Sequence, residues 1–91
     1  MNENQKIKIL DNLRTSLAKY SHDSWSGWMQ YLFEKSRKNK GGSITIPKDL
    51  VERWKRQMNT DFFDLSENER ESDYKEANNI MSIIRLIINN E

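Results

Sequence analysis

Residues 66–88, SENERESDYKEANNIMSIIRLII, carry the strongest structural signal in the chain. Ser66 is followed three residues later by Glu69, the spacing of a capping box, in which each side chain satisfies a free backbone N–H group of the other. Apolar side chains then recur every three or four residues, which is typical of an amphipathic helix. The pattern predicts a helix from Ser66 almost to the C-terminus. Its apolar face contains Tyr74, Ala77, Ile80, Met81, Ile84, Ile87 and Ile88.

The N-terminal third of the chain has the same helical period. Apolar residues from Leu10 to Phe33 are spaced by three and four, which predicts a helix over about residues 4–38. Two interpretations stay open at residues 21–24, a continuous helix or a break, because Ser and Asp side chains compete for backbone hydrogen bonds. Gly27 weakens the helix further, by about 1 kcal/mol relative to Ala.

Residues 35–42, KSRKNKGG, are basic and end in two glycines, which predicts a helix end followed by a mobile loop. This segment is either a solvated helix end or a basic arm that closes over an anionic ligand. Residues 43–46 suit a short extended segment. Pro47 suits the first turn of a second helix, which is expected to run to about Met58. Its apolar stripe contains Leu50, Val51, Trp54 and Met58.

These elements predict an all-α fold, a small bundle of three to four helices with a basic, Gly-containing loop after the first helical segment. A chain of 91 residues is expected to form one domain, residues 1–91. Phe62 and Phe63 are expected to turn inward, and Arg70 and Asp73 to form a surface pair. A homodimer or larger assembly is expected, because so small a chain has few core candidates. The expected core contains Leu13, Leu17, Trp25, Trp28, Leu32, Leu50, Trp54, Ile80 and Ile84.

The composition excludes several function classes. The chain has 15 Lys plus Arg and 14 Asp plus Glu, so no overall charge favours nucleic acid or an anionic membrane. It has no cysteine and one histidine, which excludes disulfides and thiolate or His-rich metal sites. No apolar run suits a membrane span or secretory leader, so a cytoplasmic protein is expected. No motif for catalysis, phosphate binding or metal binding is present, and neither an enzyme nor a cofactor is expected.

The densest group of aromatic residues is residues 22–33, HDSWSGWMQYLF. One face of the predicted helix carries His22 and Trp25 and continues with Trp28, Met29 and Leu32. Tyr31 is a further candidate for stacking. Such a group either builds a core or leaves rings open to stack on a planar ligand. Both interpretations stay open.

A second candidate group surrounds Trp54 in the run ERWKRQM, residues 52–58. Arg53 and Gln57 are four residues apart and share a helix face, and an Arg beside an aromatic ring suits a phosphate or carboxylate. Arg56 and Lys40 are further candidates for contact with an anion. Ordinary surface charge is the alternative.

The order of these residues resembles the domain repeated in ryanodine receptors, the RyR domain. The resemblance spans about residues 17–88 and is carried by His22-x-x-Trp25 and by Leu65, Glu69 and Asp73. Phe62 and Phe63 stand where the family has Pro-Tyr. The Trp54 helix is more similar to small phage and prophage members than to the receptor repeats.

The resemblance implies a non-catalytic helical module that binds a nucleotide or nucleotide-derived signal. For a short phage-type chain it implies a sponge that sequesters a host immune signal in the host cytoplasm. His22, Trp25, Trp28, Tyr31, Lys40, Arg53, Trp54, Arg56 and Asp73 are the ligand-binding candidates. The alternative is a protein interaction or self-assembly module with an aromatic docking surface.

Overall fold

The computed structural model describes residues 1–90. Over these residues the chain forms three α-helices and one two-stranded hairpin, so the mainly helical class predicted from the sequence is confirmed. The elements are α1 (Glu3–Lys35), β1 (Arg37–Lys38), β2 (Ile44–Thr45), α2 (Lys48–Met58) and α3 (Glu67–Asn89), with 3-10 turns at Lys40–Gly42 and Phe62–Asp64.

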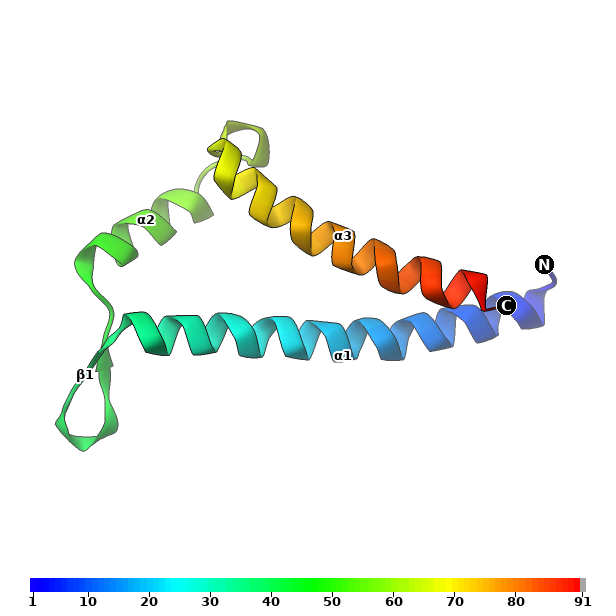
Figure 1. Cartoon of the computed structure of the whole chain (residues 1–91), viewed down its shortest axis with the longest axis horizontal. Helices are drawn as coiled ribbons and strands as arrows, with labels where there is room; N and C mark the ends of the chain where they lie inside the picture. Colours follow the sequence, from blue (N-terminus) through cyan, green and yellow to red (C-terminus); the bar gives the residue numbers. More distant parts are fainter. Residues whose placement is uncertain (91) are drawn as a thin grey trace.

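The three helices form the sides of an open triangle (Figure 1). α1 is one long side, α2 leads away from its C-terminal end, and α3 returns to meet α1 near both chain termini. The molecule measures 56 × 36 × 17 Å. No helix within residues 1–90 has the length and apolar character needed to cross a membrane.

α1 is continuous through residues 21–24, which decides between the two interpretations of that segment. Ser21 does not break the helix, because its hydroxyl donates to the Leu17 carbonyl 2.8 Å away inside the helix. The helix begins with a capping box that the sequence analysis missed. Asn2 and Gln5 exchange two side-chain-to-backbone hydrogen bonds, each 2.8 Å long.

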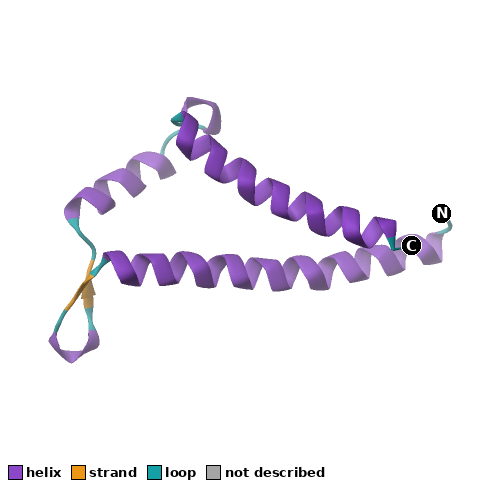
Figure 2. Ribbon diagram, viewed as in Figure 1, coloured by secondary structure: helices purple, strands orange, loops and turns teal. Residues whose placement is uncertain are grey.

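Residues 37–45 form an antiparallel hairpin where the sequence predicted a loop (Figure 2). Arg37 pairs with Thr45, and Lys38 pairs with Ile44. The turn is closed by Gly41 and Gly42, whose φ angles of 85° and 92° lie in the left-handed region that glycine adopts without steric cost. The extended segment expected at residues 43–46 is therefore present as β2.

α2 and α3 begin and end close to the predicted positions. α2 starts immediately after Pro47 and ends at Met58. At the start of α3, the Glu69 N–H donates to Ser66 Oγ at 3.3 Å, and the Ser66 N–H donates to the Glu69 carboxylate at 3.2 Å. The predicted capping box at Ser66 is therefore confirmed.

The apolar core is smaller than expected. The buried hydrophobic residues are Ile9, Leu50 and Leu65, and of these only Leu50 was predicted. The expected core positions Trp25, Trp28 and Ile80 are exposed. In the open triangle of helices, α2 holds the C-terminal part of α1 away from α3. The remaining expected core residues are half-buried: Leu13, Leu17, Leu32, Trp54 and Ile84.

Two other side-chain predictions are wrong. Phe63 is 83% exposed and does not turn inward. Met58, at the end of the predicted apolar stripe of α2, is 77% exposed. Phe62 is half-buried and packs edge-on against Tyr74, with ring centroids 5.3 Å apart. Arg70 does not pair with Asp73; its guanidinium donates to the carbonyls of Phe63 and Leu65 instead.

Candidate functional site

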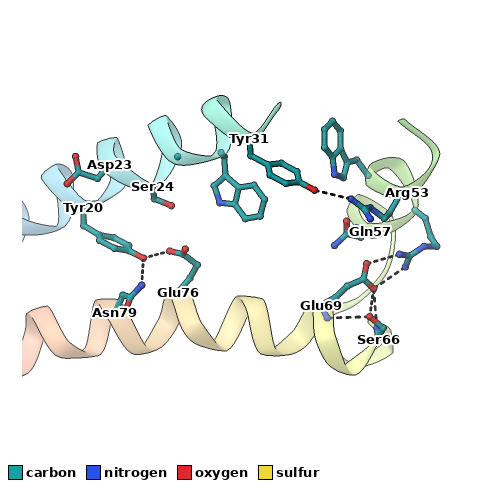
Figure 3. Close-up of a pocket in the computed structure, with 14 residues that line it drawn as sticks. Tyr20, Asp23, Ser24, Tyr31, Arg53, Gln57, Ser66, Glu69, Glu76 and Asn79 are labelled. Atoms are coloured by element: carbon teal, nitrogen blue, oxygen red, sulfur yellow. Dashed lines mark hydrogen bonds and ion pairs between the residues drawn. The ribbon is translucent and has the colours of Figure 1, made fainter. Parts of the chain in front are cut away.

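A cleft of about 890 Å³ lies inside the triangle and is lined by residues of all three helices (Figure 3). Its volume lies within the range of about 300 to 1,000 Å³ that is typical of small-molecule sites. The lining residues are Tyr20, Asp23, Ser24, Gly27, Trp28, Tyr31, Arg53, Trp54, Arg56, Gln57, Ser66, Glu69, Glu76 and Asn79.

Three aromatic rings contribute to the lining of the cleft. Trp28 and Tyr31 come from α1 and meet edge-to-face, with centroids 6.1 Å apart. Trp54 comes from α2, and its ring lies 6.4 Å from that of Tyr31. Trp28 is 52% exposed although it lines the cleft, so part of its surface is open to a planar ligand. We call these three residues the aromatic wall.

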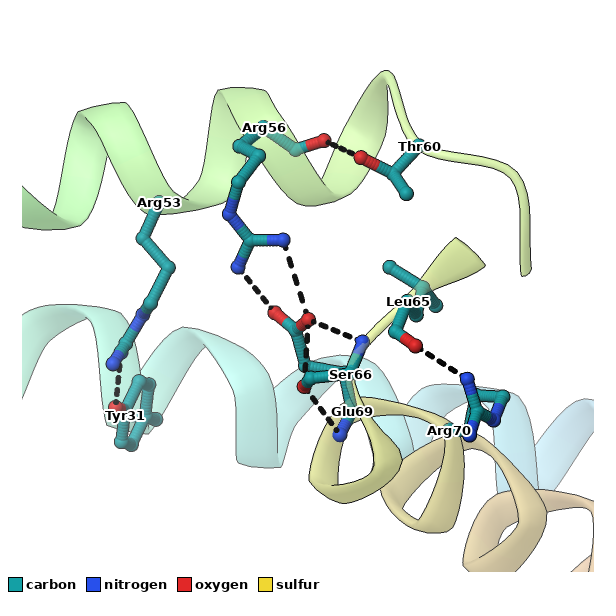
Figure 4. A network of polar contacts seen from close by, with 8 residues as sticks. All are labelled: Tyr31, Arg53, Arg56, Thr60, Leu65, Ser66, Glu69 and Arg70. Atoms are coloured by element: carbon teal, nitrogen blue, oxygen red, sulfur yellow. Dashed lines mark hydrogen bonds and ion pairs between the residues drawn. The ribbon is translucent and has the colours of Figure 1, made fainter. Parts of the chain in front are cut away.

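α2 places two arginines in the cleft, and their environments differ (Figure 4). Arg56 is bound by both oxygens of the Glu69 carboxylate, at 3.3 and 2.6 Å, so its charge is neutralised by a fork-shaped ion pair. Arg53 donates to the hydroxyl oxygen of Tyr31 at 3.3 Å, a neutral partner. Arg53 therefore keeps a guanidinium charge that is available to an anion.

The ion pair with Arg56 changes the acidity of Glu69. The Arg56 guanidinium, with a smaller contribution from the Ser66 hydroxyl, lowers the pKa of Glu69 from 4.5 to about 2. The same hydrogen bond raises the pKa of Arg56. Glu69 thus stays a carboxylate through most of the acid range, which keeps the start of α3 attached to α2.

At the opposite end of the cleft, α1 and α3 are joined by a polar contact. The Tyr20 hydroxyl donates to the Glu76 carboxylate and accepts a 3.2 Å hydrogen bond from the Asn79 amide. The hydrogen bond to Glu76 raises the pKa of Tyr20. Asp23 lines the same end (Figure 3).

The charges in the cleft are therefore separated. Arg53 and Gln57 lie at the α2 end, whereas the Asp23 and Glu76 carboxylates lie at the end where α1 approaches α3 (Figure 3). The aromatic wall also lines this cleft, with two of its rings on α1 and one on α2. Such a site can accept an anionic group at the α2 end and hydrogen-bond donors at the α1–α3 end.

The predicted ligand-binding residues divide into two groups. Trp28, Tyr31, Arg53, Trp54 and Arg56 come together in the cleft, although they are up to 28 residues apart in the sequence. The other four candidates, His22, Trp25, Lys40 and Asp73, do not line it.

The four remaining candidates lie on other surfaces. The rings of His22 and Trp25 are 6.2 Å apart on an exposed part of α1, where Trp25 borders a shallow groove with Met29 and Phe33. Lys40 lies in the hairpin turn, and Asp73 is exposed on α3. The expectation that these residues share one site with Trp54 is not supported by the geometry.

The residues at the polar end of the cleft were not predicted from the sequence. Tyr20, Ser24, Gly27 and Tyr31 are spaced by four, three and four, which could have placed them on one helix face. Glu76 and Asn79 gave no comparable signal, because their contact with Tyr20 spans more than 50 positions and depends on how α3 returns to α1.

Within residues 1–90 no cluster of His, Asp and Glu side chains has the arrangement of a metal site. Comparison of the chain with protein-family models, curated proteins and solved structures finds no match.

Proposed function

We propose that the cleft binds a nucleotide or nucleotide-derived signal and does not transform it chemically. The observation that carries this proposal is the separation of charge in a cleft that also has an aromatic wall. A nucleotide has the matching parts, an anionic phosphate, a flat base, and amino or hydroxyl groups that donate hydrogen bonds.

The base stacks on the aromatic wall in this proposal. Trp28 is 52% exposed and lines the cleft, and it is the most exposed of the three rings of the aromatic wall. Stacking of a base on an aromatic side chain is worth about 1 to 3 kcal/mol where it has been measured by substitution. This term is large enough to decide whether a small ligand binds.

The phosphate binds Arg53. This guanidinium has only the neutral Tyr31 hydroxyl as a partner, so its remaining N–H groups are free to donate to phosphate oxygens. Arg56 contributes less, because a phosphate would have to displace Glu69 from both of its nitrogen atoms. At the other end, Asp23 and Glu76 accept hydrogen bonds from the ligand's amino or hydroxyl groups.

The resemblance to the RyR domain narrows the biological role. It favours a signalling nucleotide over a metabolic substrate, and sequestration over turnover. In this proposal a phage-encoded copy of the chain would act as a sponge, lowering the free concentration of a host immune signal in the host cytoplasm.

The direct test is titration calorimetry of the purified chain against linear and cyclic adenine and guanine nucleotides and NAD-derived species. At least one ligand is expected to bind tighter than about 100 µM, which corresponds to about −5.5 kcal/mol. If every ligand in the panel binds more weakly, the proposal is wrong.

A matched pair of tryptophans tests the location of the site. Trp28→Ala should weaken binding about 5- to 150-fold, which is the stacking range expressed as an affinity ratio. Trp25→Ala removes a similarly exposed ring from the same helix, but from outside the cleft, and should leave affinity unchanged. Equal losses in the two variants would contradict binding in the cleft.

A steric variant tests the same point without removing a contact. Gly27 lines the cleft, and a Cβ added there would meet no atom within 4 Å, so a larger side chain fits without distorting α1. Gly27→Leu should therefore block the ligand while raising helix stability, since Leu is a better helix former than Gly. Circular dichroism and calorimetry on one sample measure both effects.

The alternative function is a protein interaction module. It is favoured by the shallow groove of Trp25, Met29 and Phe33 on α1, where Trp25 is 60% and Phe33 is 52% exposed. In that case no nucleotide binds, and Trp25→Ala, but not Trp28→Ala, abolishes recovery of a protein partner by pull-down.

A further inference from the structure

α3 carries an apolar stripe that is largely exposed, although Tyr74 meets the Phe62 ring and Ile84 is half-buried. Its residues are spaced by three, four, three and four positions, which is the spacing of the seam between two coiled helices. We call it the outer seam. It consists of Tyr74, Ala77, Met81, Ile84 and Ile88.

The outer seam faces away from α1. The residues of α3 that contact α1 or the space beside it include Glu76, Asn79, Ile83 and Ile87. At about 100° per residue the seam is centred about 135° around the helix from these residues, with Ile84 at the edge nearest to them. Tyr74 is 54%, Met81 is 45% and Ile88 is 49% exposed, whereas Ile84 is half-buried.

The chain as a whole exposes more surface than a stable monomer of its size. Its accessible surface is 7757 Å², whereas a compact 10.9 kDa chain is expected to expose about 5,600 Å². Its radius of gyration is 18.2 Å, against about 12 Å for a compact chain of this length. The excess of about 2,200 Å² is larger than the roughly 800 Å² that each partner buries in a standard interface. The chain therefore exposes enough excess surface to form the interface of a stable dimer.

The distribution of charge along α3 favours antiparallel packing against the α3 helix of a second copy. Residues 67–76 contain five carboxylates and two cationic side chains, whereas residues 77–90 contain one charged residue, Arg85. Two parallel helices would place the acidic segments side by side. Two antiparallel helices place each acidic segment beside the apolar, Arg-containing half of the other and also oppose the helix dipoles.

We propose that the chain forms a homodimer in which the outer seams of two α3 helices pack antiparallel about a two-fold axis at Met81. In this arrangement Tyr74 packs near the partner's Ile88, and Ala77 packs near the partner's Ile84. The cleft lies on the other side of α3, so both copies keep it open. The dimer does not depend on the proposed function of the cleft.

The absence of cysteine from the sequence allows a sharp test, because any introduced thiol is unique. Met81→Cys, oxidised at low protein concentration, should form a disulfide-linked dimer of about 22 kDa, since residues at the axis meet their own counterparts. Leu86→Cys is the matched control, because Leu86 is 66% exposed but lies about 140° around the helix from Met81. It should cross-link much more slowly.

The direction of packing is tested with the ends of the seam. Tyr74→Cys alone should not cross-link, because its counterpart lies about 14 residues, or about 21 Å, along the partner helix. A mixture of Tyr74→Cys with Ile88→Cys should cross-link. Self-linking of Tyr74→Cys would indicate parallel helices and overturn the proposal.

Light scattering on the unmodified chain completes the test. A mass near 22 kDa at micromolar concentration is expected, with a thermal midpoint that rises with protein concentration. Met81→Glu should shift the mass toward that of the monomer. A monomer mass for the unmodified chain, or equal cross-linking of Met81→Cys and Leu86→Cys, would overturn the proposal.

Discussion

The two long helices begin with the same local motif but in very different surroundings. α1 starts with the Asn2–Gln5 capping box, and its first turn adds only an exposed pair between Lys6 and Glu3, 3.4 Å apart. α3 starts with the Ser66–Glu69 box, in which Glu69 also accepts two hydrogen bonds from Arg56 of α2.

The difference shows that the same capping motif contributes more to the stability of the fold where it is joined to tertiary contacts. The box at Asn2 is exposed, and its two hydrogen bonds satisfy backbone groups of its own helix. The box at Ser66 is continuous with buried Leu65 and with the ion pair that links α2 to α3 (Figure 4). Four perturbations, from the largest expected effect to the smallest, test this contrast.

Leu65→Ala should have the largest effect. Leu65 is one of three buried hydrophobic residues and lies directly before the α3 box. Truncating a buried Leu removes transfer energy and leaves a cavity, which costs about 2 to 3 kcal/mol. Urea denaturation at fixed protein concentration measures the loss. Met58→Ala, at a position 77% exposed, is the control and should change stability by less than about 0.5 kcal/mol.

Ser66→Ala should cost about 1 kcal/mol, because it removes the side-chain acceptor for the Glu69 N–H. The denaturation midpoint reports this loss. An unchanged midpoint would show that the box does not contribute to stability. Ser72→Ala is the control, because it makes the same substitution at an exposed position of the same helix outside the box.

The pH dependence of the free energy of unfolding in acid should reveal the contribution of the Arg56–Glu69 ion pair. The pKa of Glu69 is lowered from 4.5 to about 2, so its contribution to stability is complete above pH 4.5 and is lost as the pH falls toward 2. Glu69→Gln preserves a capping-box side chain but has no charge, so it should lose less stability over this window. Denaturation of both proteins between pH 6 and 2.5 measures the difference. Identical pH profiles would contradict the ion pair.

Asn2→Ala should have the smallest effect, about 0.5 kcal/mol or less, although it removes the same kind of cap. The first turn of α1 is exposed and its cap and ion pair lie within its own helix, so its fraying is expected to leave the rest of the fold intact. Amide exchange should show faster exchange confined to the first turn. A loss as large as that of Ser66→Ala would remove the contrast between the two helix starts.

The candidate site was only partly predictable. The spacing within α2 placed Arg53 and Gln57 on one face, and both line the cleft. The choice between Trp25 and Trp28 was not available from spacing, since both belong to one broad apolar face. Trp28 lines the cleft because of the direction in which α2 leaves the hairpin, and no residue of α1 encodes that direction.

The sequence by itself determined the helices, their caps and the turn at Gly41 and Gly42, because these depend on periodicity, capping side chains and backbone freedom within a few residues. The tertiary structure decided which apolar residues are buried. Trp28 and Ile80 have core-like spacing but stay exposed, because burial requires a facing surface and α2 holds α1 and α3 apart. Trp25 stays exposed on a groove of α1 outside the cleft. The tertiary structure also decided the partners of Arg56, Arg70 and Tyr20, since a side chain with several possible acceptors bonds the one that the folded chain brings within reach.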